Sequence, residues 1–340
     1  MVTIKDIAKA AQVSVTTVSR ALNGYFDVNE DTRRKIESIA KQLGYSPNMA
    51  ARSLISKKTK TLGLLLSNVT RDSSKDNIAY EVLCGINDRA GELDYDLVLF
   101  STTPQKQKLK SYKTLCQERG VDGVIIMGIR LDDPYLKEIV SSDIPCVLID
   151  IALEGTNVGY VTSDNTAGAY SAVSHLILSG HRHIAMINGH IQADVSLLRL
   201  AGYRQALREH GVPYDESLVL DGQFSEKGGY EAAMAILKAR PDVTALFCAS
   251  DLMALGALNA VKQSGASVPD DISIIGFDNI NLTAYCSPAL TTVHQHKYEL
   301  GFHSAQLLIE MLEDRETEHH VQLQTELILR DSVKNRKREG

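Results

Sequence analysis

Three polar residues near the N-terminus recur at i, i+4 and i+7: Thr16, Arg20 and Asn23. In a helix, side chains at this spacing lie on one face, and Thr17 and Ser19 flank that face. Hydroxyl groups bind phosphates or base edges, and a guanidinium can form two hydrogen bonds with the O6 and N7 atoms of guanine. The pattern therefore indicates a surface that reads DNA. The alternative interpretation is the solvated face of an ordinary small helical domain.

A second group of polar residues follows short apolar runs in the rest of the chain. Ligands of parallel sheets bind beyond the carboxyl ends of the strands, so these residues are candidates for a binding site. Their hydroxyls, amides and carboxylates suit hydrogen bonding to a polyhydroxyl or heterocyclic solute. The group consists of Ser67, Asn68, Ser101, Thr102, Met127, Asp150, Asn188, Ser250, Asp251, Asp278 and Asn279.

Motifs for other kinds of chemistry are missing from the sequence. No glycine-rich phosphate loop follows the first apolar run, and no G-x-S-x-G nucleophile elbow occurs. The five cysteines are widely scattered, and histidine pairs such as His294 and His296 have no third ligand at a site-forming spacing. We therefore expect neither enzymatic activity, nor a cofactor, nor a bound metal.

The first sixty residues predict three short helices that would position the N-terminal polar group. Thr3 precedes the first helix as a capping residue, and Ser14 is a good N-cap for a second helix over 15–22. A third helical stripe runs near 31–43 and ends at Gly44. Two helices joined by a tight turn and braced by a third describe a helix-turn-helix.

From residue 61 onward, continuous apolar runs alternate with segments of helical length and period. The runs include 62–66, 124–127 and 245–248, and the helical segments include 78–93 and 252–264. Such alternation predicts an α/β fold in which helices cover both faces of a parallel sheet. Seven or more such units are too many for one small sheet, so we expect two doubly wound lobes.

Charge is distributed unevenly along the 340 residues. Residues 1–60 contain 11 Lys and Arg against 5 Asp and Glu, which leaves 25 basic and 37 acidic residues in the other 280. A basic unit attached to an acidic one favours a polyanionic partner for the first unit alone. The N-terminus has no signal-peptide pattern and no apolar stretch approaches 20 residues, so we expect a cytoplasmic protein associated with the nucleoid.

Three motifs lie in order between Thr3 and Leu54: V-S-x-x-T-V-S-R, T-R-x-x-I and G-Y-x-P-N-x-x-A-R-S-L. The segment resembles the headpiece of the LacI/GalR family of bacterial transcription regulators. The resemblance implies a helix-turn-helix headpiece over 1–46, and a hinge helix and linker over 47–60 whose Leu54 wedges into the minor groove. The DNA-contacting residues that it implies are Thr3, Ser14, Val15, Thr16, Thr17, Ser19, Arg20, Asn23, Thr32, Tyr45, Asn48, Ala51 and Leu54.

The same resemblance extends to about Asp331 through stretches such as VDGVIIMG, LRLAGYRQAL and VPDDISIIGFDN. It implies a core with the fold of periplasmic sugar-binding proteins. The first lobe would comprise 61–161 plus 292–321, the second 162–291 plus 322–333, and a basic tail 334–340 would follow. The effector-binding residues that the resemblance implies are Asp150, Arg199, Phe224 and Asp278, with Ser67, Ser250 and Gln295 as further candidates.

The resemblance implies a homodimeric, allosteric repressor of a pseudo-palindromic operator. We expect its effector to be a sugar or sugar phosphate. A nucleobase corepressor stays open, because the purine repressor has a similar headpiece, and so does a catabolite-control regulator that acts with a phosphoprotein partner. A transport protein would lack the headpiece, and an enzyme would need a phosphate loop or a catalytic dyad.

Overall fold

The computed structural model describes residues 2–22, 25–45, 58–67, 77–102, 107, 109–316 and 318–339. The chain divides into two compact units, Met1–Thr59 and Lys60–Gly340, which we describe separately. Four expected DNA contacts lie outside the described residues: Asn23, Asn48, Ala51 and Leu54. The expected hinge helix lies outside them as well.

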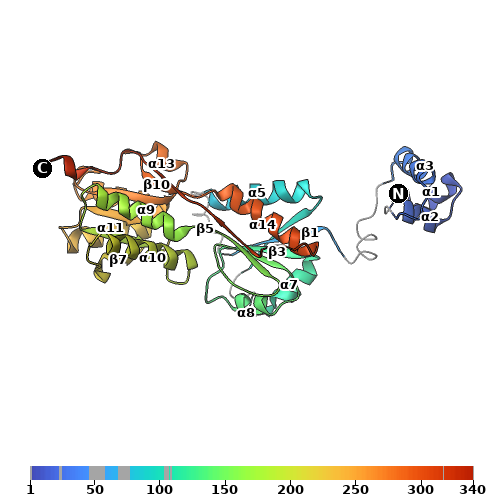
Figure 1. The fold of residues 1–340 in the computed structure, drawn as a ribbon, viewed down its shortest axis with the longest axis horizontal. Coiled ribbons are helices and arrows are strands. Elements are labelled where there is room, and N and C mark those ends of the chain that lie inside the picture. The colour runs from blue at the N-terminus through green and yellow to red at the C-terminus, as the bar shows by residue number, and fades with distance from the viewer. Residues whose placement is uncertain are drawn as a thin grey trace. The chain divides into compact units, whose positions relative to one another are not determined.

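The first unit has the predicted helix-turn-helix architecture, with α1 at Ile4–Ala11, α2 at Val15–Leu22 and α3 at Glu30–Gln42 (Figure 1). The turn between the first two helices contains Gln12 in the left-handed region, at φ 58°. The Ser14 hydroxyl accepts a hydrogen bond from the Thr17 amide at 3.0 Å, which confirms Ser14 as the N-cap of α2. Ile7, Val18 and Ile36 are fully buried at the junction of the three helices.

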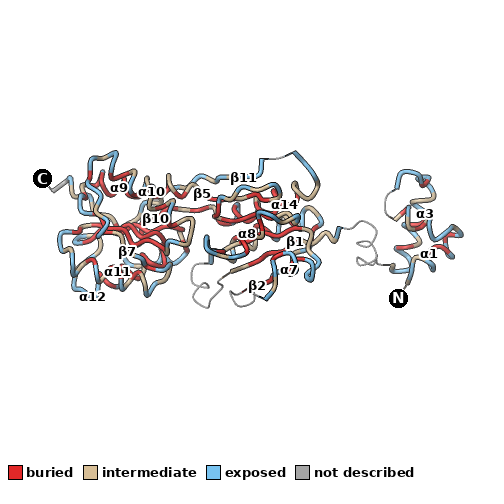
Figure 2. Tube along the Cα trace, turned by 90° about the horizontal axis from the view of Figure 1, so that it is seen from below, coloured by how far each residue is buried: buried red, intermediate tan, exposed pale blue. Residues whose placement is uncertain are grey.

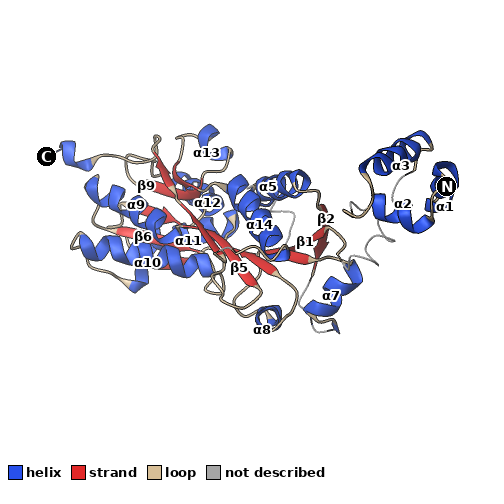
Figure 3. Cartoon of the chain, turned by 45° about the vertical axis from the view of Figure 1, so that its right-hand side comes forward, coloured by secondary structure: helices blue, strands red, loops and turns tan. Residues whose placement is uncertain are grey.

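The first lobe of the second unit contains a six-stranded sheet in the order β11-β5-β4-β3-β1-β2 among the described residues. Helices α5 and α14 pack on one face of this sheet, and α7 and α8 pack on the other (Figure 3). The strands are β1 Thr61–Leu66, β2 Asp96–Ser101, β3 Gly123–Met127, β4 Cys146–Ile149, β5 Val158–Ser163 and β11 His320–Leu323. The helices are α5 Ile78–Glu92, α7 Tyr112–Arg119, α8 Pro134–Val140 and α14 Lys297–Leu312.

The second lobe repeats this plan around a sheet in the order β12-β10-β9-β8-β6-β7. Its strands are β6 Ile184–Asn188, β7 Val219–Asp221, β8 Ala245–Cys248, β9 Ser273–Asp278, β10 Thr291–His294 and β12 Glu326–Ile328. Its helices are α9 Asn165–Leu178, α10 Asp194–Glu209, α11 Glu226–Ala239, α12 Asp251–Gln263 and α13 Leu282–Tyr285. Buried residues concentrate along the central strands of both lobes (Figure 2). The prediction of two parallel α/β lobes is therefore confirmed.

The chain crosses between the lobes three times, and the crossings correct the expected lobe boundaries. The strand β5 continues to Ser163, and β11 continues to Leu323, both in the first sheet. The expected boundary at 292 is wrong, because β10 pairs in parallel with β9 of the second sheet through His294. Each expected boundary lay two or three residues too early, since the strands run directly into the crossings without a turn signal.

The first residues of the basic tail contact the second lobe. The Arg336 amide donates a hydrogen bond to the Ser179 carbonyl at 2.8 Å. The Lys334 amide binds the Ser273 hydroxyl at 3.0 Å, and His181 Nε2 lies 3.1 Å from the Lys334 carbonyl oxygen. The first residues of the tail therefore pack on the second lobe, because their backbone completes hydrogen bonds of that lobe.

Candidate functional site

A cavity of about 310 Å³ lies between the two lobes, beyond the carboxyl ends of β1, β3 and β4 of one sheet and β6, β8 and β9 of the other. Cavities of this size accommodate small molecules. All seven effector-binding candidates from the sequence line it: Ser67, Asp150, Arg199, Phe224, Ser250, Asp278 and Gln295. The fold thus brings together residues that are up to 228 positions apart (295 − 67) in the chain.

Several other residues were candidates because they follow strands of a parallel sheet, but they do not line the cavity. Met127 does line the cavity. Ser101 is the last residue of β2, which is the edge strand of its sheet, and Thr102 follows it. The Asn188 side chain donates a hydrogen bond to the Ser196 carbonyl. Asp251 is buried, where it accepts hydrogen bonds from the Thr292 hydroxyl at 2.6 Å and the Ile280 amide at 2.9 Å. Asn279 does not line the cavity either, and Asn68 lies outside the described residues.

Three of the cavity residues have left-handed backbone conformations. The φ angle is 61° at Asp150, 50° at Phe224 and 112° at Asp278. A non-glycine residue in this region costs free energy and persists only where the surrounding structure enforces it. Each strained residue directs a side chain into the same cavity, and such strain is typical of functional sites.

Arg199 connects the buried polar groups of the second lobe. Its Nε donates a hydrogen bond to Asn165 Oδ1 at 2.8 Å, and Nη1 donates one to the Ala249 carbonyl. The guanidinium also lies 3.8 Å from the centroid of the Phe277 ring. Burial lowers the pKa of Arg199, and the charge of Asp278 opposes that effect. Gln295 Nε2 donates a hydrogen bond to Asp278 Oδ1 at 2.7 Å, and Arg199 Nη1 forms an ion pair with the same oxygen at 3.7 Å.

Asp150 supplies the matching carboxylate from the first lobe. Burial raises its pKa, whereas the charge of Arg199 and a hydrogen bond from the Thr162 hydroxyl at 3.1 Å lower it. Carboxylates accept hydrogen bonds from ligand hydroxyls, and the planar guanidinium can donate to two acceptors. The polar part of the cavity therefore suits a ligand with several hydroxyl or ring N–H groups.

The sequence did not point to three further lining residues: Arg130, His190 and Asp194. They lie in or just after the loops that follow β3 and β6. The sequence pattern indicated only the first residues after each strand, and these three lie further along the chain. The lobes contact each other here, because the Leu131 amide donates a hydrogen bond to the Gln192 carbonyl at 2.9 Å. Asp194 Oδ2 accepts a hydrogen bond from the Ala152 amide at 3.3 Å. Only the three-dimensional contact between these loops reveals the three residues.

The described DNA-contact candidates group around α2 of the first unit. Ser14, Val15, Thr16 and Arg20 are exposed, and Thr17 and Ser19 are half-buried. The Arg20 guanidinium forms a two-point ion pair with Asp27, with Nε–Oδ1 at 3.1 Å and Nη2–Oδ2 at 2.5 Å. The helical spacing in the sequence did not predict this ion pair, because Asp27 lies in the loop after α2.

The remaining candidates of the first unit lie at its helix ends. The Thr3 amide and hydroxyl both donate hydrogen bonds to Asp6, at 2.8 and 2.7 Å, which occupies the Thr3 hydroxyl in capping α1. Thr32 and Tyr45 are half-buried, at the start of α3 and just after its end. Whether these residues contact DNA stays a prediction.

Comparisons with known proteins bear on both units. The family model described as bacterial regulatory proteins, lacI family, matches residues 3–48, and a periplasmic binding protein-like domain matches residues 173–333. An HTH-type transcriptional repressor, PurR, of Vibrio campbellii is 37% identical over 338 residues, which cover 98% of this chain and 99% of the relative. The chain belongs to the LacI family of bacterial regulatory proteins.

Solved structures of LacI-family proteins share the architecture of this chain. A complex of the transcriptional regulator CelR with cellobiose has a TM-score of 0.75 and 32% identity, covering 98% of this chain and 100% of that chain. The lac repressor dimer bound to operator and the anti-inducer ONPF has a TM-score of 0.80 and 28% identity, covering 98% and 99%. Membership in the LacI family makes the chain a DNA-binding transcriptional repressor with a small-molecule effector.

Within the described ranges, none of the helices combines the length and the apolar character needed to cross a membrane. The same ranges contain no group of three or more His, Cys, Asp or Glu side chains arranged to hold a metal ion.

Proposed function

We propose that this repressor acts as a homodimer whose operator affinity is set by a carbohydrate effector in the inter-lobe cavity. The observation that carries the proposal is the convergence of Asp150, Arg199 and Asp278 on one cavity, with Phe224 beside them. Carboxylates and a guanidinium hold hydroxyl groups, and an aromatic ring covers the apolar face of a sugar. The similar regulator CelR was solved with cellobiose, which supports a sugar as the ligand class.

The inter-lobe position of the cavity gives the effector a way to act on DNA binding. A ligand shifts an equilibrium only through different affinities for the two states. Gln295 lies in the crossing from β10 to α14, so a ligand that engages Asp278 and Gln295 also engages a connection between the lobes. Closing or opening the lobes would thereby change the spacing of the two headpieces in a dimer.

The geometry of DNA reading supports a homodimer. One helix-turn-helix reads a half-site, and two half-sites about one helical turn apart need two headpieces. The similar lac repressor was solved as a dimer bound to operator, which supports the same assembly for this chain. The twofold axis would then make the operator pseudo-palindromic.

A nucleobase corepressor is the second candidate. It is favoured by the 37% identity to the repressor PurR of Vibrio campbellii and by the T-shaped pair of His190 and Phe224, whose ring centroids lie 5.5 Å apart. Such a ring pair could also cover a flat heterocycle. A catabolite-control regulator with a phosphoprotein partner is a third possibility that a pull-down from lysate would detect. We propose no catalytic turnover of the effector and no cofactor.

Selection of a DNA site from a randomised duplex library by the purified full chain tests the proposal. We expect an enriched pseudo-palindrome at physiological ionic strength, and a dimer in sedimentation with that duplex. Chromatography of the effector before and after incubation should show it unchanged. A lack of any enriched sequence, or a monomer on the selected duplex, would contradict the proposal.

A further inference from the structure

The loop after β3 brings a second cation to the inter-lobe cavity. Arg130 and Arg199 are the two arginines among the described lining residues. The Arg199 side chain is 4% exposed and is committed to Asn165, Ala249 and Asp278, whereas the Arg130 side chain is 45% exposed. Arg130 therefore can pair with a ligand without breaking a buried network.

The present partner of Arg130 is exchangeable. Its Nε lies 3.0 Å from Asp132 Oδ1 and its Nη2 3.3 Å from Asp132 Oδ2. The Asp132 side chain is 53% exposed, and ion pairs between exposed groups contribute little free energy because water and salt screen them. A ligand anion held in the less hydrated cavity can therefore replace Asp132.

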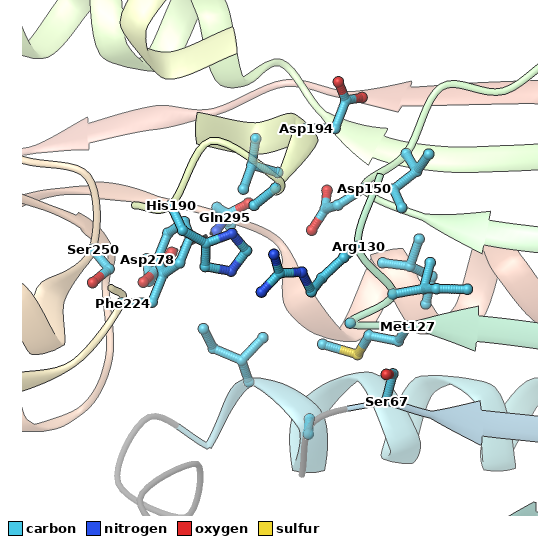
Figure 4. A pocket seen from close by; sticks show the side chains of 18 of the residues that line it. Ser67, Met127, Arg130, Asp150, His190, Asp194, Phe224, Ser250, Asp278 and Gln295 are labelled. Atoms are coloured by element: carbon cyan, nitrogen blue, oxygen red, sulfur yellow. Dashed lines mark hydrogen bonds between the residues drawn. The ribbon is translucent and has the colours of Figure 1, made fainter. Parts of the chain in front are cut away.

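The groups around Arg130 leave hydrogen-bonding capacity unused. Figure 4 shows the guanidinium of Arg130 directed toward the ring of His190. His190 Nδ1 is buried and has no hydrogen-bond partner among the described residues, and the same is true of Gln295 Oε1. Burial, and then the positive charge of Arg130, lowers the pKa of His190, so the ring is neutral near pH 7. Buried polar atoms without partners are costly, and a bound ligand would satisfy them.

The other carboxylates of the cavity do not oppose an anion at Arg130. Asp278 is held by Arg199 and Gln295. Asp150 accepts a hydrogen bond from the Thr162 hydroxyl, and the charge of Arg199 offsets its own charge. Asp194 already accepts the Ala152 amide hydrogen. A single ligand can thus place hydroxyl groups on the carboxylates and a negative group on Arg130.

On the basis of the proposed function, we propose that the effector is a polyhydroxylated solute with one anionic group, a carboxylate or a phosphate ester, and that Arg130 binds this group. A guanidinium forms two parallel hydrogen bonds with either anion, and such charge-assisted pairs are about twice as strong as neutral ones. Arg130 is then the residue that makes the protein bind the anionic effector more tightly than its neutral analogue.

Matched sugars test this inference by calorimetry with the full-length protein. For glucose, galactose and mannose, the neutral sugar, its uronic acid and its 6-phosphate differ only at C6, so the acid and phosphate arms separate the two anion sources. We expect at least one anionic member to bind at least tenfold more tightly than its neutral parent. Arg130→Gln should lower the affinity for that anionic ligand at least tenfold and change the affinity for the parent sugar by less than twofold.

Two further variants complete the test. Asp132→Asn removes the competing carboxylate and should raise the affinity for the anionic ligand. Arg119 is an exposed arginine at the end of α7, and Arg119→Gln should leave that affinity unchanged. Operator binding by Arg130→Gln without effector checks that the variant folds. Failure of every acid and phosphate to bind overturns the inference. A neutral sugar that binds wild-type and Arg130→Gln equally well overturns it too, while the proposed function stands. Binding of hypoxanthine or guanine in place of any sugar overturns both the inference and the carbohydrate effector, in favour of the nucleobase candidate.

Discussion

Arg199 Nη1 lies 3.7 Å from Asp278 Oδ1, and both side chains are 4% exposed. The pair joins α10 to the end of β9, so it links the interior of the second lobe to the wall of the cavity. Removing one member of a buried pair leaves the other charge uncompensated in an environment that solvates it poorly. The pair is therefore both a structural element of the lobe and part of the candidate effector site.

We predict that Arg199→Ala lowers the free energy of unfolding of the core by about 3–5 kcal/mol, because Asp278 and Asp150 lose their buried counter-charge. Urea denaturation at pH 7 measures the loss. The double variant Arg199→Met with Asp278→Asn should recover part of it, since no unpaired charge remains at Asp278. A loss below about 1 kcal/mol in the single variant would show that the pair is not a structural element.

We predict that Gly189→Ala weakens effector binding. A Cβ atom at this position would lie 2.0 Å from the Phe224 ring, so the ring has to leave its place in the cavity wall. The matched control is Gly91→Ala, in α5, where a Cβ atom has no neighbour within 4 Å and alanine favours the helix by about 0.5–1 kcal/mol. Calorimetry with the effector and thermal unfolding measure both effects. Equal affinity in Gly189→Ala and wild type would remove Phe224 from the binding surface.

We predict that Arg20→Ala costs about 1–3 kcal/mol of operator affinity and relaxes selection at one base position. Arg20→Lys should lose most of the same discrimination, because an ammonium group cannot form the two parallel hydrogen bonds of a guanidinium. Repeating the duplex selection with each variant measures the change. A uniform loss across all sequences would instead identify Arg20 as a phosphate contact.

We predict that acid destabilises the core in part through His181. Burial lowers the pKa of His181 from 6.5 to about 4, so between these values the unfolded chain takes up a proton that the folded core excludes. Stability therefore falls as the pH is lowered from about 6.5 toward 4, by up to about 3 kcal/mol. His181→Gln should flatten this part of the pH dependence, and the exposed His319→Gln should not. Parallel curves for His181→Gln and wild type would contradict the prediction.

The sequence predicted most of the fold because hydrophobic period and capping are local signals. The second helix was placed at Val15–Leu22 from its stripe and Ser14, and the structure confirms it. Strands such as β10, with the sequence TTVH, were missed, because threonines interrupt the apolar run that marks a buried strand. The strand β10 pairs with β9 across an intervening segment that contains α13, so no local sequence pattern reports the pairing.

The same distinction holds for the candidate site. Asp150, Ser250 and Asp278 were nominated at strand ends, because a topological rule places such residues together. Arg130 and His190 lie on loops whose course depends on contacts between lobes, including the Leu131–Gln192 hydrogen bond. No spacing along the chain encodes that contact, so these two residues could be found only in three dimensions.

The affinity of the full chain for its selected duplex, with and without the effector, tests the central claim most directly. By fluorescence anisotropy at physiological ionic strength, we predict that the effector changes the wild-type Kd for the duplex at least fivefold. The variant Asp278→Asn should bind the duplex with wild-type affinity and show no such change. An identical Kd in wild type with and without a ligand shown to occupy the cavity would contradict the account.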